Sequence, residues 1–331
     1  MNVMTIFFKK TILLAVAFFA LSCASQGGRT QAGMSASSSA DNPQTQVKFN
    51  ADSAFGHVEA QCNFGPRVPG TAAHKACAGY LENYLRTHCD EVVVQRPTLT
   101  TFDGTRLEAV NLIGVINPQA ERRILLVAHW DCRPWADSDP DPAKVNEPVM
   151  GANDGASGTA VLLELARIFQ AQKPEVGVDL LLTDVEDWGA EDNEDSWALG
   201  TQYWVANRHK ESYKPLFGIL LDMVGAKGAT FHREAFSEMY APSVVDEVWR
   251  IAAEQGFSQF FIDSSTGGGA TDDHVCINKG GIPCIDIIDM RQDSSTGFYP
   301  GWHTTHDTVD QIDTATLQAV GQTLAALIYE Y

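Results

Sequence analysis

Short runs of apolar residues alternate with amphipathic segments from about residue 49 to the end of the chain. Runs rich in Val, Ile and Leu predict strands buried on both faces, and apolar residues at helical spacing predict helices. The predicted helices are 49–63, 71–85, 159–172, 200–207, 243–255 and 314–329, and the predicted strands are 91–95, 107–116, 123–130, 178–183, 217–223, 259–262 and 282–290. This alternation predicts an α/β fold, a three-layer sandwich with a central mixed, largely parallel sheet flanked by helices.

The chain begins with the pattern of an export signal. Lys9 and Lys10 precede an apolar run, residues 11–21. A basic start followed by an apolar run of this length is typical of a secretory signal peptide, which we assign to residues 1–22. Cys23 follows directly, so we expect cleavage before it and attachment of a lipid to it. The alternative is ordinary cleavage that removes Cys23.

Residues 23–47 are rich in Ser, Ala, Gly and Gln and have no apolar period, which predicts a flexible tether. The remaining residues, 48–331, are enough for one large domain with its own core. We therefore expect an exported, periplasmic protein that contacts a membrane only through its lipid anchor. We also expect a monomer.

The charge of the chain narrows its possible partners. The formal net charge is −19, which argues against binding to nucleic acid or to an anionic membrane surface. An acidic protein suits cationic substrates, such as peptides with a free N-terminal amine. The chain has seven Cys and no CxxC pair, so a structural zinc site built from thiolates is not predicted. The sequence leaves any disulfide pairing open.

The strand predicted at 178–183 runs into three closely spaced carboxylates, Asp184, Glu186 and Asp187. Their mutual repulsion must be offset, and a bound cation would do so. Ligands of open α/β sheets bind outside the carboxyl ends of the strands. Because Glu186 and Asp187 are adjacent, one can hold a metal while the other carries a proton. The alternative interpretation of this segment is a solvated acidic loop.

Further acidic and His side chains lie at the ends of other predicted strands or in the loops beside them. They are His129, Asp131, Asp154, Asp222 and His303. Each has a structural explanation when taken alone; Asp154, for example, could cap the helix that follows it. Together they offer nitrogen and oxygen ligands at one edge of the sheet. A set that includes His but no thiol favours zinc over calcium.

The order of these motifs resembles a known superfamily. The motifs are HWD at 129–131, GANDGASG at 151–158, the pair Glu186–Asp187, LLDMVG at 220–225, TDDH at 271–274 and WHT at 302–304. This order resembles the zinc aminopeptidase superfamily of the M28 type over residues 48–331. Within it, the double Asp of TDDH, the Trp before His303 and the stretch HWDCRPWAD at 129–137 are more similar to the single-zinc glutaminyl cyclases, in particular animal-type enzymes of bacteria.

The resemblance implies a role for each of these residues. The implied zinc ligands are Asp154, Asp187 and His303, the implied catalytic residues are Glu186, Asp222 and Asp272, and the implied substrate-binding residues are Trp302 and Trp188, with Trp197 as an alternative to Trp188. Asp187 stands where many relatives have Glu, so the metal would lie closer to the main chain. One Zn²⁺ per chain is implied.

The activity that the resemblance implies is glutaminyl-peptide cyclotransfer. The enzyme would convert N-terminal Gln of peptides and exported proteins to pyroglutamate, with release of ammonia; N-terminal Glu is a second implied substrate. The alternative is a di-zinc aminopeptidase of the M28 type, in which His129 and Asp222 complete a second zinc site. A catalytically silent, lipid-anchored binding protein is disfavoured, because such a relative would be expected to have lost some ligands.

Overall fold

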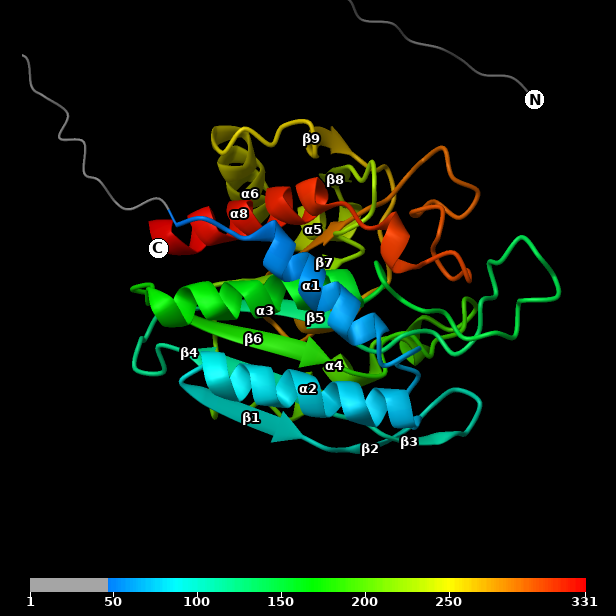
Figure 1. Cartoon of the computed structure of the whole chain (residues 1–331). Coiled ribbons are helices and arrows are strands. Elements are labelled where there is room, and N and C mark those ends of the chain that lie inside the picture. The colour runs from blue at the N-terminus through cyan, green and yellow to red at the C-terminus, as the bar shows by residue number, and fades with distance from the viewer. Residues whose placement is uncertain (1–46) are drawn as a thin grey trace, which may run out of the picture. The chain divides into compact units, whose positions relative to one another are not determined.

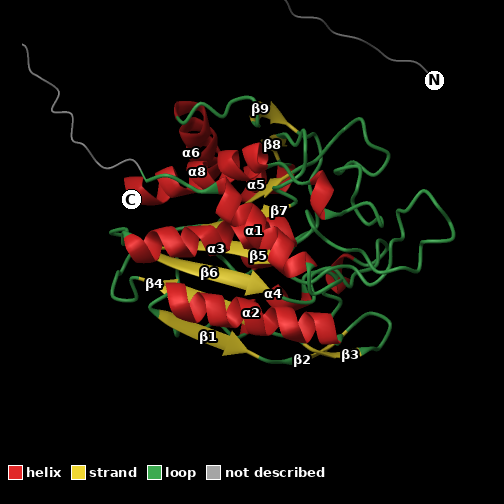
Figure 2. Cartoon of the chain, viewed as in Figure 1, coloured by secondary structure: helices red, strands yellow, loops and turns green. Residues whose placement is uncertain are grey.

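The computed structural model describes residues 47–331 (Figures 1 and 2). Its central sheet has six strands in the order β1-β4-β6-β5-β7-β10. They are β1 (Glu91–Gln95), β4 (Asn111–Ile116), β5 (Arg123–His129), β6 (Gly177–Thr183), β7 (Gly218–Asp222) and β10 (Cys284–Ile288). Strands β6, β5, β7 and β10 are parallel, whereas β4 is antiparallel to both of its neighbours. The mixed, largely parallel sheet expected from the sequence is confirmed.

The continuous apolar runs arise because both faces of the central strands are buried. In β5, Ile124 and Leu126 belong to the large core on one face, while Leu125 and Val127 belong to a smaller core on the other. Successive side chains of a strand point to opposite faces. A strand that is buried on both faces therefore shows no polar alternation, which is the pattern that identified it.

Helices cover both faces of the sheet, which gives the three layers (Figure 1). The large core lies under α1 (Ala51–Cys62), α2 (Ala72–His88), α3 (Ala156–Ala171), α6 (Pro242–Glu254) and α8 (Thr314–Glu330). The smaller core lies under α4 (Leu199–Ala206) and α7 (Asp273–Lys279), and α5 (Ala235–Tyr240) packs against β10. Every helix predicted from the sequence is present, with ends shifted by a few residues.

Several short elements were not predicted. They are β2 (Thr98–Thr100), β8 (Phe231–Arg233), α5 and α7, together with the 3-10 turns Glu194–Ser196 and Val309–Gln311. The strand expected at 107–116 is two strands, β3 (Arg106–Glu108) and β4. The strand expected at 259–262 lies a few residues later, as β9 (Phe261–Ser265). Helix α7 begins after Asp272, which caps it by accepting a hydrogen bond from the amide of Asp273.

The predictions for the signal peptide, for Cys23 and for nearly all of the tether fall on residues 1–46, outside the described residues. In the part of the chain that is described, no helix combines the length and the apolar character needed to cross a membrane. The cysteines of that part are Cys62, Cys77, Cys89, Cys132, Cys276 and Cys284, and all of them are free thiols.

The contact between α3 and the sheet generates a first prediction. A Cβ added to Gly158 would overlap the carbonyl oxygen of Leu221 and lie 3.1 Å from the Cβ of Ala128. Gly158→Ala should therefore push α3 away from β7 and lower the free energy of unfolding by about 1–3 kcal/mol in urea titrations. The control is Gly79→Ala in α2, where a Cβ meets nothing within 4 Å. Gly79→Ala should be neutral or stabilising, by roughly 0.5–1 kcal/mol. Equal effects of the two substitutions would contradict the packing argument.

Candidate active site

The carboxyl ends of β6, β5 and β7 meet at one edge of the sheet, where long loops gather (Figure 1). His129 ends β5 and Asp222 ends β7. Glu186 and Asp187 follow β6, and the loop before α3 supplies Asp154. These three strands are neighbours in the sheet, so residues far apart in the sequence lie close together. This is the edge at which ligands of α/β sheets bind.

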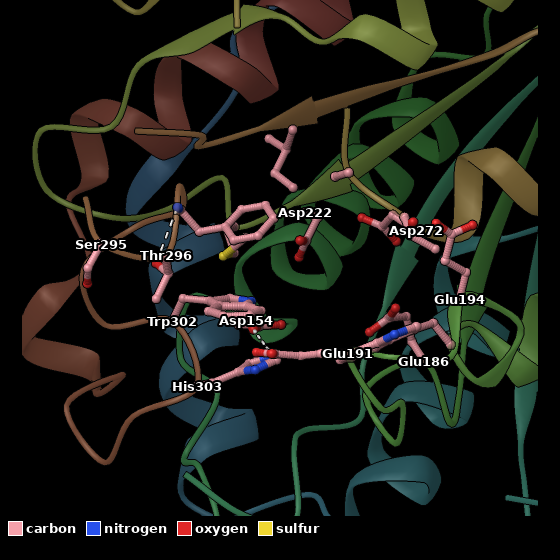
Figure 3. Close-up of a pocket in the computed structure, with 16 residues that line it drawn as sticks. Asp154, Glu186, Glu191, Glu194, Asp222, Asp272, Ser295, Thr296, Trp302 and His303 are labelled. Atoms are coloured by element: carbon pink, nitrogen blue, oxygen red, sulfur yellow. Dashed lines mark hydrogen bonds and ion pairs between the residues drawn. The ribbon is translucent and has the colours of Figure 1, made fainter. Parts of the chain in front are cut away.

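A first set of possible metal ligands consists of Asp154, Asp187 and His303, all of them buried. Their ligand atoms lie within 4.8 Å of one another. His303 Nε2 is 3.2 Å from Asp187 Oδ1 and 3.9 Å from Asp154 Oδ2. Figure 3 shows His303 beside Asp154 at the wall of the cavity.

A second buried set, His129, Asp154 and Asp222, shares Asp154 with the first. His129 Nε2 is 3.0 Å from Asp154 Oδ1 and 3.2 Å from Asp222 Oδ1. Gly155 leaves room for this imidazole, because a Cβ there would lie 2.5 Å from its Cε1 atom. The structure thus brings together the ligands of both the one-metal and the two-metal arrangement that the resemblance implied, whereas Asp131 belongs to neither set.

The first set fits a zinc ion. Among the described residues, the buried Oδ2 atom of Asp187 has no hydrogen-bond partner. A buried carboxylate oxygen without a donor is costly, and a cation would satisfy it. Two carboxylates and one imidazole also form a nitrogen and oxygen donor set of the kind that binds Zn²⁺ and leaves a position open for substrate.

Two further carboxylates hold the main chain of the site in place. Asp131 accepts hydrogen bonds from the amides of Glu186, at 3.2 Å, and Asp187, at 3.3 Å. Asp307 accepts from the amides of Asn153, at 2.9 Å, and Asp154, at 3.0 Å. No sequence pattern singled out Asp307, because it is one Asp in a loop and lies outside the recognised motifs.

The backbone is strained beside several site residues. Val185, Met223 and His303 have φ angles of 54°, 50° and 54°, in the left-handed region. Such a conformation is uncommon for residues other than glycine, especially for a β-branched one, and costs on the order of 1–3 kcal/mol. All three residues lie at the carboxyl edge of the sheet. The surrounding packing must therefore hold the ligands in positions that the local backbone does not favour.

The metal sets open into a cavity of about 490 Å³ (Figure 3). Its polar side carries the carboxylates Asp154, Glu186, Asp222 and Asp272, and its apolar side is formed by Trp197, Met223, Ile288, Phe298 and Trp302. The Trp302 ring stacks on His303, with 3.6 Å between ring centroids and 20° between planes. Trp197 is also nearly parallel to His303, at 6.0 Å and 16°. Exposed Glu191 and Glu194 lie at the rim.

Trp188 does not line this cavity. It packs against a small cluster that includes Leu107 and Val185, and its indole N–H donates to Asp103 at 3.4 Å. Of the aromatic residues considered from the sequence, Trp302 and Trp197 face the cavity. The direction of each Trp depends on the conformation of the loop after β6, which the spacing of residues does not encode.

The carboxylates of the cavity strongly influence one another. Burial, and then repulsion by Asp272, raises the pKa of Glu186 well above the ordinary carboxyl range. Burial and repulsion by Asp222 raise the pKa of Asp272 in the same way. Burial and repulsion by Asp154 raise the pKa of Asp222 to about 6. Burial and mutual repulsion thus favour the protonated forms of these carboxyl groups over those of exposed ones.

The last two members of the TDDH motif lie behind the cavity wall. Asp273 accepts a hydrogen bond from the Thr183 hydroxyl at 2.7 Å, and His274 Nε2 is 3.2 Å from Glu234. Asp286 lies close to this His and is fully buried. Among the described residues neither of its carboxylate oxygens has a hydrogen-bond partner. The motif therefore contributes Thr271 and Asp272 to the cavity and its other two residues to the support of the cavity.

A sequence model of peptidase family M28 matches residues 111–328. The chain belongs to peptidase family M28. This confirms the superfamily expected from the order of the motifs. Because the match extends from β4 to α8, it includes both metal sets and every residue discussed at the cavity.

Two solved structures of differently described proteins are similar to this chain over most of its length. The glutaminyl cyclase of Bacteroides thetaiotaomicron is 46% identical, with a TM-score of 0.84 over 86% of this chain and 99% of that one. A Zn-dependent exopeptidase of Parabacteroides distasonis is also 46% identical, with a TM-score of 0.85 over 86% of this chain and 100% of that one. The expected likeness to bacterial glutaminyl cyclases is thus confirmed.

Two curated relatives are less similar to this chain. The aminopeptidase YwaD of Bacillus subtilis is 28% identical over 244 residues, which cover 70% of this chain. The glutaminyl-peptide cyclotransferase of Bos taurus is 24% identical over 259 residues, which cover 67% of this chain. The matches cover 47% of the length of YwaD and 66% of the length of the bovine enzyme.

The burial of Asp286 generates a prediction about stability. Burial, and then repulsion by Asp272 and Asp222, raises the pKa of Asp286 well above its ordinary 3.8. The folded state thus binds a proton that the unfolded state has released, so stability is lost as the pH rises from 3.8 towards the raised value. Asp286→Asn should remove this loss and stabilise the protein at about pH 7, by about 1.4 kcal/mol for each unit of raised pKa.

Thermal unfolding measured from about pH 4 to about pH 7 tests this, because the linkage acts only between the two pKa values. The stability of the Asn variant should depend less on pH than that of the wild type. Asp192→Asn on the exposed loop after β6 is the control and should leave the profile unchanged. A variant that is less stable than the wild type at neutral pH would contradict the prediction.

Proposed function

We propose that this chain is a zinc-dependent glutaminyl-peptide cyclotransferase. The observation that carries the proposal is the carboxylate pair Glu186 and Asp272, which faces the cavity beside the first metal set without belonging to either set. Cyclisation must move a proton from the substrate's α-amine to the nitrogen that leaves. A pair of carboxylates with raised pKa values suits that transfer. The similarity to bacterial glutaminyl cyclases supports the same assignment.

In the proposed reaction, the side chain of an N-terminal Gln enters the cavity with its γ-amide towards Asp154, Asp187 and His303. A Zn²⁺ held by these residues would polarise the γ-carbonyl group. The α-amine attacks the γ-carbon, a C–N bond forms, and the C–N bond to the amide nitrogen breaks. Ammonia leaves, and the peptide then begins with pyroglutamate.

The side chains of the cavity would each have one task in this reaction. Glu186 accepts the proton that the attacking amine gives up and then donates it to the leaving nitrogen. Asp272 favours the protonated form of Glu186 by charge repulsion, and Asp222 accepts a hydrogen bond from the amine. Trp302 and Trp197 form an apolar wall that excludes water, because water in the site would hydrolyse the amide instead of allowing ring closure.

We propose one zinc ion per chain, bound by the first set. The second set supports a second candidate function, that of a di-zinc aminopeptidase. His129, Asp154 and Asp222 are close enough together to hold another ion. The two functions differ in metal content and in products, so they can be told apart by experiment.

The proposed substrates are peptides and exported proteins with a free N-terminal Gln, with N-terminal Glu as a second substrate. The cavity is lined by several carboxylates and, among the described residues, by no Lys or Arg, which suits a cationic N-terminus. We also propose an exported, periplasmic location for the enzyme, as a monomer anchored through Cys23. The basic start, the apolar run and the Cys that follows it support the signal and the anchor.

The proton-transfer role generates a prediction. Glu186→Gln removes the proton carrier but leaves the proposed zinc ligands in place. The variant should release ammonia from a Gln-headed peptide about 10²–10⁴ times more slowly and should keep its zinc. Exposed Glu211→Gln is the control and should behave as the wild type. Near-normal cyclisation by the Glu186 variant would show that the assigned role is wrong.

A second experiment separates the two candidate functions. Purified protein is assayed with Gln-headed and Ala-headed peptides before and after treatment with a zinc chelator, and its metal content is measured. The cyclotransferase should release ammonia but no free amino acid, should lose that activity with the chelator, and should contain one zinc per chain. Release of alanine by a protein with two zinc ions would instead identify the aminopeptidase.

A further inference from the structure

The guanidinium group of Arg133 lies beside the first metal set and has no role in the reaction described so far. Arg133 follows β5 by four residues and is only 1% exposed. A buried guanidinium must be paired, and all three of its nitrogens are used here. Nε donates to Asp137 Oδ1 at 2.8 Å, Nη2 donates to Asp137 Oδ2, and Nη1 lies 3.3 Å from Asp187 Oδ1.

Arg133 is thus linked to two ligands of the same ion. It contacts Asp187 directly, through both the carboxylate and the main-chain oxygen. It reaches His303 through Asp137, because Asp137 Oδ1 is 3.5 Å from His303 Nδ1. The other ring nitrogen of His303, Nε2, faces Asp187. A carboxylate on the far nitrogen of a metal-binding imidazole fixes the orientation and the tautomer of the ring.

Aromatic rings hold the same guanidinium in place. Its Cζ atom lies 5.1 Å from the ring centroid of Trp135 and 5.0 Å from that of Trp197. Trp197 in turn stacks on His303. Cation–π contacts of this kind favour one position for the guanidinium. Trp197 therefore contacts both the guanidinium group and the imidazole that Asp137 contacts.

We propose that Arg133 and Asp137 are positioning residues that set how tightly Asp154, Asp187 and His303 hold their ion. This inference rests on the proposed zinc site. Without the two-pronged contact between the Arg133 guanidinium and Asp137, the side chains of Asp187 and His303 are free to turn away from a common centre. The ligands themselves remain. Partners of metal ligands typically contribute 10–100-fold to metal affinity.

The test is the zinc affinity of the purified protein, measured by competition with a chromogenic chelator. Arg133→Lys keeps the charge but loses the planar fork. Asp137→Asn keeps the shape but loses the charge. Each variant should bind zinc roughly 10–100 times more weakly than the wild type. The double variant should be little worse than either single variant, because the two residues act as one unit.

Arg123→Lys is the matched control. Arg123 is buried at the opposite end of β5 and makes the same two-pronged contact with Asp179, at 2.7 Å from both Nε and Nη2. Its substitution should lower the thermal unfolding temperature of the metal-free protein without changing zinc affinity. If the substitutions of Arg133 and Asp137 acted only by loosening the packing of the fold, Arg123→Lys would weaken zinc binding as well.

The outcomes are distinct. If the wild type binds no zinc, the proposed metal site itself fails. If the wild type binds zinc and both variants bind it equally tightly, the positioning role is overturned and the metal site stands. If Arg133→Lys does not fold, Asp137→Asn decides, because the Asp137 side chain is 36% exposed and tolerates the change more readily.

Discussion

Negative charge concentrated at one edge of the sheet is the constraint on which the site depends. Buried carboxylates follow β6, β5 and β7, and Asp154 and Asp272 join them from adjacent loops. Burial of one ionised carboxylate is costly, and burial of several together is costlier still. The chain can hold this arrangement only if cations or protons offset the charge.

The structure uses three means to offset this charge. Imidazoles contact carboxylates, as His129 does with Asp154. The Arg133 guanidinium contacts Asp187 and Asp137. Protons remain on the carboxylates that face the cavity, as the raised pKa values of Glu186 and Asp272 indicate. A divalent ion would be a fourth means, and two of its candidate positions share Asp154. The buried charge that destabilises the folded state at this site thus also enables the site to bind metal and to transfer protons.

Sequence patterns predicted the features that repeat or that have a distinctive chemical type. Strands buried on both faces leave continuous apolar runs, and His and Asp at strand ends mark a metal set. Features fixed only by tertiary contacts escaped prediction. The Arg133–Asp137–His303 contact joins residues from separate loops, and helix α7 is too short to show a helical period. The outward direction of Trp188 and the inward direction of Trp197 follow from the path of one loop.

The free thiols of the described chain have a consequence for how the protein can be produced. Cys62, Cys77, Cys89, Cys132 and Cys284 are buried, and Cys276 is partly so. Burial raises the pKa of the Cys132 and Cys284 thiols, so these two stay protonated and unreactive. Among residues 47–331, no disulfide has to form before the domain reaches its native state. The domain can therefore mature in the reducing cytosol of an expression host, without a thiol oxidase or a disulfide isomerase.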